Sequence, residues 1–347
     1  MLGEKYTEAF HRLAAEVNAA GLMRRRHGYY WFQILFWIVV TAGVLVGVAV
    51  LGDSWLQLLL AAVMGLAMAQ LGFLGHEAAH RQVFQSDRWN EWTARIIAGL
   101  VTGLSYGWWI GKHNRHHANP NKEREDPDSE SGVLSFTPEG TDRRTGLAAK
   151  LARFQGYYFP PLLLFEGFSL HVDSVRNILF GKNVHVRWLE VVFTGIRLIG
   201  FVAFLFLMLP PLLAAGFILV QVGVFGFLLG GAFSPNHIGM PTVPHDADID
   251  FLRRQVVMSR NVRGGPVVHF LMGGLEYQIE HHLFPRVPRP NLPGVQSIVR
   301  RYCREYGIRY TETTLGEAFR TIIAYLNQVG LKNRDAYRCP LVQVYRG

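Results

Sequence analysis

Long uncharged apolar runs constrain the fold of this chain more than any other feature of its sequence. Residues 29–51, 55–75 and 212–233 contain no charged side chain over 23, 21 and 22 positions. A helix needs about 20 such residues to cross about 30 Å of hydrocarbon. The chain is also 50% hydrophobic, with a mean hydropathy of +0.14, which is too apolar for an ordinary soluble enzyme. We therefore predict an all-α integral membrane protein.

A fourth apolar segment, residues 188–209, carries two charges. Glu190 lies near its start and Arg197 lies inside it. We still predict a span, because Arg197 is close enough to one end for its side chain to snorkel to the interface. The sequence thus predicts four transmembrane helices.

The flanking charges predict the orientation of these spans. Arg24, Arg25 and Arg26 directly precede the first run, and the positive-inside rule places such residues in the cytoplasm. Four spans then put both termini on the cytoplasmic side, together with a helical cap formed by residues 81–187 and 238–347. No internal repeat or flexible linker divides residues 1–347, so we expect a single domain.

Two shorter apolar segments are predicted to lie in the membrane interface. Residues 96–110 are uncharged over 15 positions, about 22 Å of helix, which is too short to span comfortably. Residues 155–165 contain Pro160 and Pro161, which argue against a continuous span.

The net charge and the cysteine content point to a membrane protein with free thiols. The net charge is +9, but no basic run outside the spans is interleaved with aromatic residues, so we expect no nucleic-acid partner.

The two cysteines, Cys303 and Cys339, lie outside the spans. We interpret both as free thiols on a reducing face.

Histidines concentrate in four places along the chain. HEAAH occupies 76–80, directly after the second run; HNRHH occupies 113–117; His237 follows the last run; and QIEHH occupies 278–282. With four spans, all four places lie at the cytoplasmic membrane boundary, as expected of a metal site assembled from several elements. The candidate metal ligands are His76, His80, His113, His116, His117, His237, His281 and His282.

The spacing of these histidines predicts two metal ions. Residues three or four positions apart share one face of a helix, so His76 and His80 can approach one metal. Adjacent histidines diverge by about 100°, so His116 and His117 are placed to serve two ions. A zinc ion takes three or four protein ligands, and eight imidazoles exceed that need. Ligand type alone leaves Fe, Zn, Cu and Ni open.

Two other classes of protein use some of these features. HEAAH alone matches the H-E-x-x-H motif of zinc peptidases, but an intramembrane protease has no use for HNRHH or QIEHH. A histidine-lined metal transporter would place ionisable residues at mid-depth in its spans, whereas these clusters lie outside the apolar runs.

Taken together, the motifs resemble the membrane fatty acid desaturase family, whose three histidine boxes are H-x₃-H, H-x₂-H-H and [H/Q]-x₂-H-H. HEAAH, HNRHH and QIEHH match these boxes in order, and the resemblance extends from the first apolar run to Pro285. GGLEYQIEHHLFP at 273–285, and HNRHHANPN followed by DPD at 126–128, are similar to the front-end and acyl-lipid branch.

The resemblance implies an O₂-dependent oxidoreductase with two iron ions held by the eight histidines. Its expected reaction introduces a cis double bond into a long acyl chain carried by coenzyme A or a membrane lipid. A fatty acyl or lipid hydroxylase with the same boxes remains an alternative, because both reactions begin with the same hydrogen abstraction.

The resemblance also carries expectations about partners. Front-end members often carry a fused cytochrome b5 domain with an H-P-G-G motif, which does not occur in this sequence. We therefore expect a separate electron donor of the ferredoxin or cytochrome b5 type, served by a NAD(P)H reductase.

Residues beside the predicted ligands are expected to support them. Gln278 stands where related chains have a ninth histidine, so a water molecule or His269 is the alternative ligand there. Glu77, Asn236 and Glu280 are expected to orient an imidazole or a bound water. We interpret DPD at 126–128 as a turn. The alternative is that its carboxylates, Asp126 and Asp128, pair with nearby Lys and Arg side chains.

Overall fold

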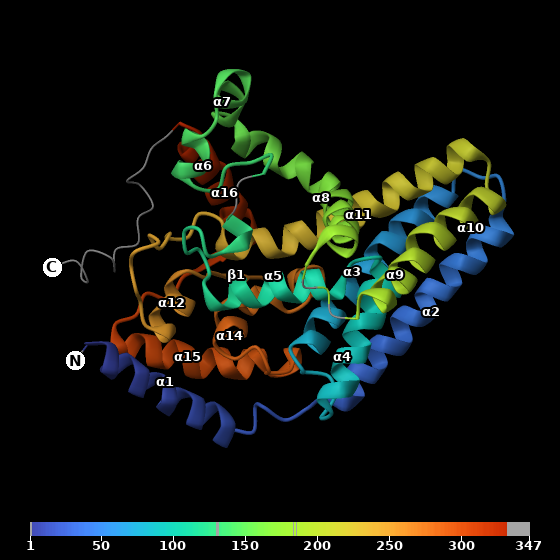
Figure 1. Cartoon of the computed structure of the whole chain (residues 1–347). Coiled ribbons are helices and arrows are strands. Elements are labelled where there is room, and N and C mark those ends of the chain that lie inside the picture. The colour runs from blue at the N-terminus through green and yellow to red at the C-terminus, as the bar shows by residue number, and fades with distance from the viewer. Residues whose placement is uncertain (1, 130–131, 183, 185, 332–347) are drawn as a thin grey trace. The chain divides into compact units, whose positions relative to one another are not determined.

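The computed structural model describes residues 2–129, 132–182, 184 and 186–331 (Figure 1). Helices dominate this part of the chain, and its one sheet has two strands, so the predicted all-α class is confirmed. The chain forms two compact units: unit 1 comprises residues 1–24, 112–160 and 232–347, and unit 2 comprises residues 25–111 and 161–231. The division falls within three helices, α5 (Tyr106–Ala118), α8 (Gln155–Phe180) and α11 (Pro211–His237).

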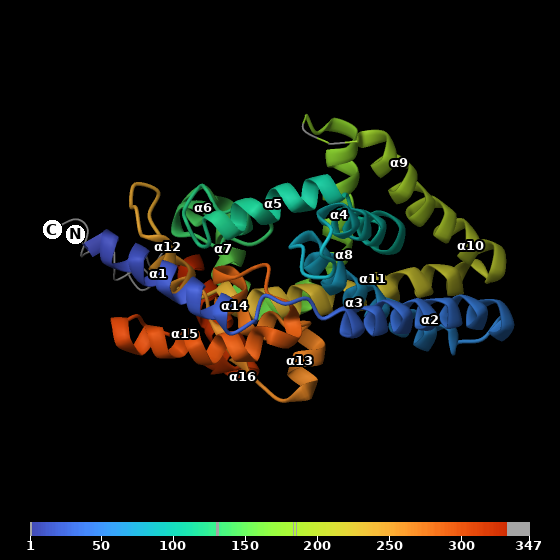
Figure 2. The same ribbon diagram turned by 90° about the horizontal axis from the view of Figure 1, so that it is seen from below.

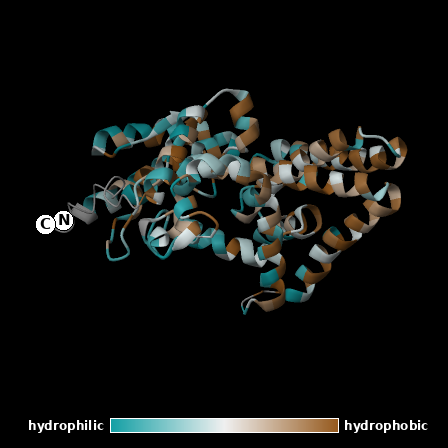
Figure 3. Ribbon diagram, turned by 90° about the horizontal axis from the view of Figure 1, so that it is seen from above, coloured by the Kyte–Doolittle hydropathy of each residue, from teal (hydrophilic) through white to brown (hydrophobic). Residues whose placement is uncertain are grey.

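Among the described residues, four helical segments are long and apolar enough to cross a membrane, as the sequence predicts. Their ribbons are largely brown, the colour of hydrophobic residues, in Figure 3. The third segment is continuous in the chain but changes from α to π geometry in its middle. The segments are α2 (His27–Leu51), α3 (Gln57–Ala79), α9 (Arg187–Gly195) with η3 (Ile196–Gly200) and α10 (Phe201–Met208), and α11.

Close helix packing in unit 2 depends on small residues. A Cβ atom added at Gly65 of α3 would lie 2.6 Å from the carbonyl oxygen of Gln221 in α11. In the same way, a Cβ atom at Gly167 would lie 2.5 Å from the carbonyl oxygen of Val222. Small residues allow helix backbones to approach within a membrane, where no hydrophobic effect draws helices together.

The segment expected to be one interfacial helix over residues 96–110 is broken. α4 (Asp87–Ile96) continues into a π-helical turn, η1 (Ile97–Thr102), and the chain then breaks at Gly103 before α5 begins. Gly103 has a φ of +76°, a left-handed conformation that glycine adopts without strain.

Arg197 in η3 stabilises this break, so the prediction that it snorkels to the interface is wrong. Its side chain is buried, its Nε donates to the carbonyl oxygen of Val101 at 2.7 Å, and its guanidinium lies over the Phe201 ring. Because the π-helical turn leaves backbone carbonyls without regular helical partners, a buried donor at this position satisfies one of them.

The prolines expected to interrupt residues 155–165 do not do so. α8 continues through Pro160 and Pro161 for 26 residues. It is not among the four segments that are apolar enough to span a membrane, in agreement with the prediction that this segment does not cross.

Unit 1 contains the N-terminal helix and the C-terminal third of the chain. α1 (Leu2–Ala19) lies beside α15 (Leu292–Tyr306) in both views (Figures 1 and 2), and both pack on one apolar core. The buried Cys303 is a free thiol in this core, and Cys339 lies outside the described residues. The two strands, β1 (Asn261–Arg263) and β2 (Glu312–Thr314), pair in parallel, with Val262 opposite Thr313.

The remaining elements of unit 1 are short, apart from the final helix. They are η2 (Pro127–Ser129), α6 (Pro138–Asp142), α7 (Gly146–Ala152), α12 (Phe251–Val257), α13 (Pro266–Met272), η4 (Leu275–Tyr277), α14 (Gln278–Leu283), η5 (Arg289–Asn291) and α16 (Leu315–Gly330).

Candidate metal centre

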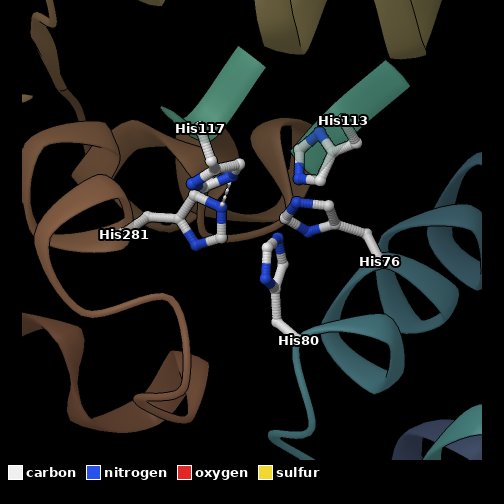
Figure 4. A group of neighbouring side chains, drawn as sticks. All are labelled: His76, His80, His113, His117 and His281. Atoms are coloured by element: carbon white, nitrogen blue, oxygen red, sulfur yellow. Dashed lines mark hydrogen bonds between the residues drawn. The ribbon is translucent and has the colours of Figure 1, made fainter. Parts of the chain in front are cut away.

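The first histidine pair lies at the end of a membrane helix in unit 2. α3 continues through His76 to Ala79, and His80 caps it by donating its backbone N–H to the His76 carbonyl oxygen at 3.1 Å. The two ring centroids are 4.8 Å apart, on one side of the helix (Figure 4). Glu77 is buried in the same turn. The helical spacing of HEAAH therefore brings its two imidazoles together, as predicted.

Six histidines of unit 1 form two groups of three. The His117 cluster comprises His113, His117 and His281, whose rings turn toward one another (Figure 4). The His116 cluster comprises His116, His237 and His282. Within each cluster, nitrogen atoms of the three rings lie within 4.8 Å of one another.

The two clusters divide the adjacent histidine pairs between them. α5 contributes His117 to one cluster and His116 to the other, and α14 contributes His281 and His282 in the same way. The Nε2 atoms of His117 and His281 are 3.2 Å apart, and those of His116 and His237 are 3.3 Å apart. The divergence of neighbouring side chains on a helix, used above to predict two ions, is thus present within unit 1.

Each ring of the His116 cluster is held through its Nδ1 atom. His116 Nδ1 is 3.0 Å from Asp126 Oδ1, His237 Nδ1 is 3.2 Å from the Met258 carbonyl oxygen, and His282 Nδ1 is 2.9 Å from Gln255 Oε1. An oxygen acceptor at Nδ1 favours the tautomer with its proton there, which leaves the Nε2 lone pair for a metal. The donor set and its hydrogen bonds therefore fit a bound metal ion.

Asp126 is the residue of this site that sequence reasoning misjudged. Its carboxylate accepts His116 Nδ1 and also the backbone N–H groups of Asn121 and Asp128, at 2.7 and 2.9 Å. Burial lowers the pKa of His116, but the charge and hydrogen bond of Asp126 together with the charge of Asp128 outweigh it, so the net shift of this pKa is upward. DPD forms a turn, as predicted, because the Asp126 carbonyl oxygen accepts from the Ser129 backbone N–H at 3.2 Å. Asp128 also pairs with a basic residue, Lys112. The Asp126 carboxylate binds His116 and not a basic side chain. Its position only ten residues after His116 in the sequence was a signal for this contact.

Two amide side chains lie beside the His116 cluster. Gln278 Nε2 is 2.9 Å from His237 Nε2, and Asn236 Nδ2 donates to Gln278 Oε1 at 3.2 Å. His269 contacts the carboxylate of Glu276 and is 42% exposed. The structure thus places Gln278, and not His269, next to these histidines.

Glu280 directly precedes the two box histidines of α14, but its carboxylate is hydrogen-bonded to residues outside the two clusters. Its carboxylate accepts hydrogen bonds from Asn261 Nδ2 at 2.6 Å and from the Tyr310 hydroxyl at 2.8 Å. Burial raises the pKa of this carboxyl to about 7. Its contacts attach α14 to β1 and to the segment that precedes β2.

Comparison with known proteins gives a consistent assignment. The family model described as fatty acid desaturase matches residues 53–314. A Delta(8)-fatty-acid desaturase of Helianthus annuus is 26% identical over 94% of this chain and 74% of its own length. The Delta(6)-fatty-acid desaturase fat-3 of Caenorhabditis elegans is 28% identical over 88% of this chain and 71% of its own length. A Delta(8)-fatty-acid desaturase of Borago officinalis is 25% identical over 96% of this chain and 78% of its own length.

Proposed function

The chain belongs to the fatty acid desaturase family, and we propose that it introduces a cis double bond into a long acyl chain, with O₂ as oxidant, at a centre of two iron ions. The family assignment makes it an oxidoreductase that acts on fatty acyl chains. The observation that carries the proposal for the metal centre is the arrangement in unit 1, where Nδ1 atoms bind oxygen acceptors and Nε2 atoms converge.

In this proposal all eight box-related histidines are iron ligands. The His116 cluster holds one ion and the His117 cluster contributes to the other. His76 and His80, which share one side of α3, complete the set of eight. Bound iron would supply the redox chemistry that acid–base side chains lack, because oxidation of an unactivated methylene group requires a redox cofactor.

The residues around the clusters keep the imidazoles in one orientation. Asp126, the Met258 carbonyl and Gln255 fix the tautomer of each ring in the His116 cluster. Gln278 occupies the place beside His237 that a ninth histidine would take, so we propose that an amide or a water completes the ligand set there. Such support typically changes metal affinity by about 10- to 100-fold.

The membrane spans suit an acyl substrate. Burial of each CH₂ group contributes about 0.8 kcal/mol, so a long chain supplies ample binding energy. We propose that coenzyme A or a membrane lipid carries this chain and that a ferredoxin or cytochrome b5 type protein with a NAD(P)H reductase supplies electrons. Arg24–Arg26 before α2 support a cytoplasmic site with both termini on that side.

Expression in a host that lacks the product, followed by fatty-acid profiling and metal analysis, tests the proposal. We expect a new unsaturated fatty acid, whose double-bond position the profile reads directly, and two irons per purified chain. His116→Ala should abolish the product and lower the iron content. The exposed His11 lies outside both clusters, so His11→Ala should do neither. A hydroxy acid would indicate the hydroxylase instead, and stoichiometric zinc would contradict the di-iron centre.

A further inference from the structure

A row of large apolar side chains is exposed on unit 1, where α7 leads into α8. Leu147, Leu151, Phe154 and Tyr157 are 71, 52, 59 and 68% exposed. Leu147 and Leu151 are one helical turn apart on α7, Phe154 lies in the turn between the two helices, and Tyr157 lies in the first turn of α8. Phe154 N–H donates to the Leu151 carbonyl oxygen, and Tyr157 N–H to that of Phe154, each at 3.0 Å. These bonds form the turn that joins α7 to α8, and we call the four residues the 147–157 stripe.

Other residues of the same segment pack against the rest of unit 1, so the side chains of the stripe point away from unit 1. Ala152 is fully buried, and a Cβ atom added at Gly330 of α16 would lie 1.9 Å from its carbonyl oxygen. Gln155 is also buried, and its Nε2 donates to the carbonyl oxygens of Ser135 and Leu326, each at 2.8 Å. Figure 1 shows α7 and α16 as neighbours within unit 1. The stripe is therefore the outer face of a segment held firmly from behind.

Basic side chains flank the stripe. Lys150 and Arg153 are exposed and form no ion pair within the part of the chain that the structure describes. Arg144 donates to the Gly132 carbonyl oxygen at 2.7 Å, which brings the 72% exposed Val133 to the same segment. Arg143 differs, because Glu139 neutralises it at 2.8 Å. Three positive charges beside the stripe thus lack a carboxylate partner among the described residues.

We propose that the 147–157 stripe lies in the interfacial layer of the bilayer, with Arg144, Lys150 and Arg153 bound to the phosphates of anionic phospholipids. An apolar face with basic flanks is the composition of segments that lie in a membrane surface. Four described helical segments of the same chain are long and apolar enough to span a membrane, so a bilayer that they enter would be at high local concentration. A second copy of this chain fits less well, because apposed stripes would bring like charges together.

Spin labelling in nanodiscs tests this inference without reference to catalysis. The full chain carries Leu147→Cys with a nitroxide, and Cys339 is replaced by Ser; Cys303 is buried. Nanodiscs contain phosphatidylcholine alone or mixed with phosphatidylglycerol. Collision with oxygen reports a lipid-facing label, and collision with an aqueous nickel chelate reports a water-facing one. We expect a lipid-facing label, and a larger lipid-facing fraction in the anionic discs.

The charge-reversed pair Lys150→Glu with Arg153→Glu provides the decisive comparison. Each basic residue near an anionic surface contributes about a fivefold preference. Removing both preferences would lower the ratio of lipid-facing to water-facing label about 25-fold in anionic discs. Because the two Glu side chains also repel anionic lipid, we expect at least this decrease, with little effect in neutral discs. Arg304→Glu with Arg309→Glu makes the same charge change at exposed positions away from the stripe and should leave the ratio unchanged.

Three results would overturn the inference. A label that collides with the nickel chelate in both lipid mixtures would show that the stripe faces water. A label shielded from both oxygen and nickel would show that a protein, or a second copy of this chain, covers it. An equal effect of the Arg304 and Arg309 pair would show that net charge, and not this surface, responds to the lipid.

Discussion

Removal of the Asp126 charge is the most direct perturbation of the metal centre. Asp126 Oδ1 is 3.0 Å from His116 Nδ1, and the two side chains are only 1 and 6% exposed, so water cannot replace a lost partner. Asp126→Asn keeps an acceptor of similar shape. A hydrogen bond to a charged group contributes about 1–2 kcal/mol more than a neutral one. We therefore expect iron to bind about 5- to 30-fold more weakly.

Competition with a chelator of known affinity, carried out anaerobically with Fe(II), measures this change. Glu139→Gln is the matched control, because it also removes one carboxylate of the same unit, but an exposed one bound to Arg124 and Arg143. The control should bind iron as the parent does. A folded Asp126→Asn chain with unchanged iron affinity would refute the reasoning. If Asp126→Asn lowered the free energy of unfolding of the iron-free protein by as much as it lowers that of iron binding, the main role of Asp126 would instead be to hold the turn at Asn121, whose backbone N–H it accepts.

Three further changes test other parts of the structure. Gln278→His adds an imidazole beside the His116 cluster, so a chelator should remove iron more slowly; faster removal would contradict this. Burial raises the pKa of Glu280 from 4.5 to about 7, so the folded state retains this proton longer than the unfolded state. Protonated Glu280 therefore contributes its full share to the free energy of unfolding below pH 4.5, and this contribution is lost as the pH rises to about 7. Denaturant titrations of the metal-free proteins measure this. Between pH 4.5 and 8 the free energy of unfolding of Glu280→Gln should rise, relative to that of the parent, by up to about 3 kcal/mol. A difference between the two proteins that does not change with pH would contradict the raised pKa. Gly65→Ala would place a methyl group 2.6 Å from a backbone oxygen of α11 and should destabilise the protein by about 1–3 kcal/mol. Thermal unfolding in detergent measures this change. Gly43→Ala is the control, because a Cβ atom there meets open space, and it should leave thermal unfolding unchanged.

The membrane helices were predictable from the sequence because their signal is local. A span requires only length and the absence of charge, and the first predicted run, 29–51, differs from α2 by two residues at one end. The end of α3 was less predictable. The apolar run stops at Gly75, but the helix continues to Ala79, because a polar residue ends an apolar run without ending a helix.

The irregular parts of the fold were not predictable, because packing decides them. Pro160 and Pro161 each remove one helical hydrogen bond, yet α8 continues through both. The break at Gly103 depends on a guanidinium, that of Arg197, more than ninety residues away in the sequence. No local pattern around either position reports such a contact.

The site was predictable in its histidines but not in what holds them. The divergence of adjacent histidines follows from helix geometry alone, and unit 1 contains the two clusters that it implies. The acceptors of the Nδ1 atoms are different. Gln255 and the Met258 carbonyl lie in the segment that includes α12, which carries no recognisable motif, and become partners only through tertiary contact. Sequence can thus identify candidate ligands before it can identify the groups that set their tautomers.

The way in which α5 and α14 share the histidines has a mechanical consequence. Each helix contributes imidazoles to both clusters, so a shift of either helix changes both clusters together. Gln255 strengthens this coupling, because its Oε1 accepts from His282 Nδ1 and its Nε2 donates to the His117 carbonyl oxygen, both at 2.9 Å. Two ions bound to such clusters would keep a nearly constant separation. A site that must hold one carbon–carbon bond in a fixed position requires that rigidity, and here it comes from two short helices and one amide side chain.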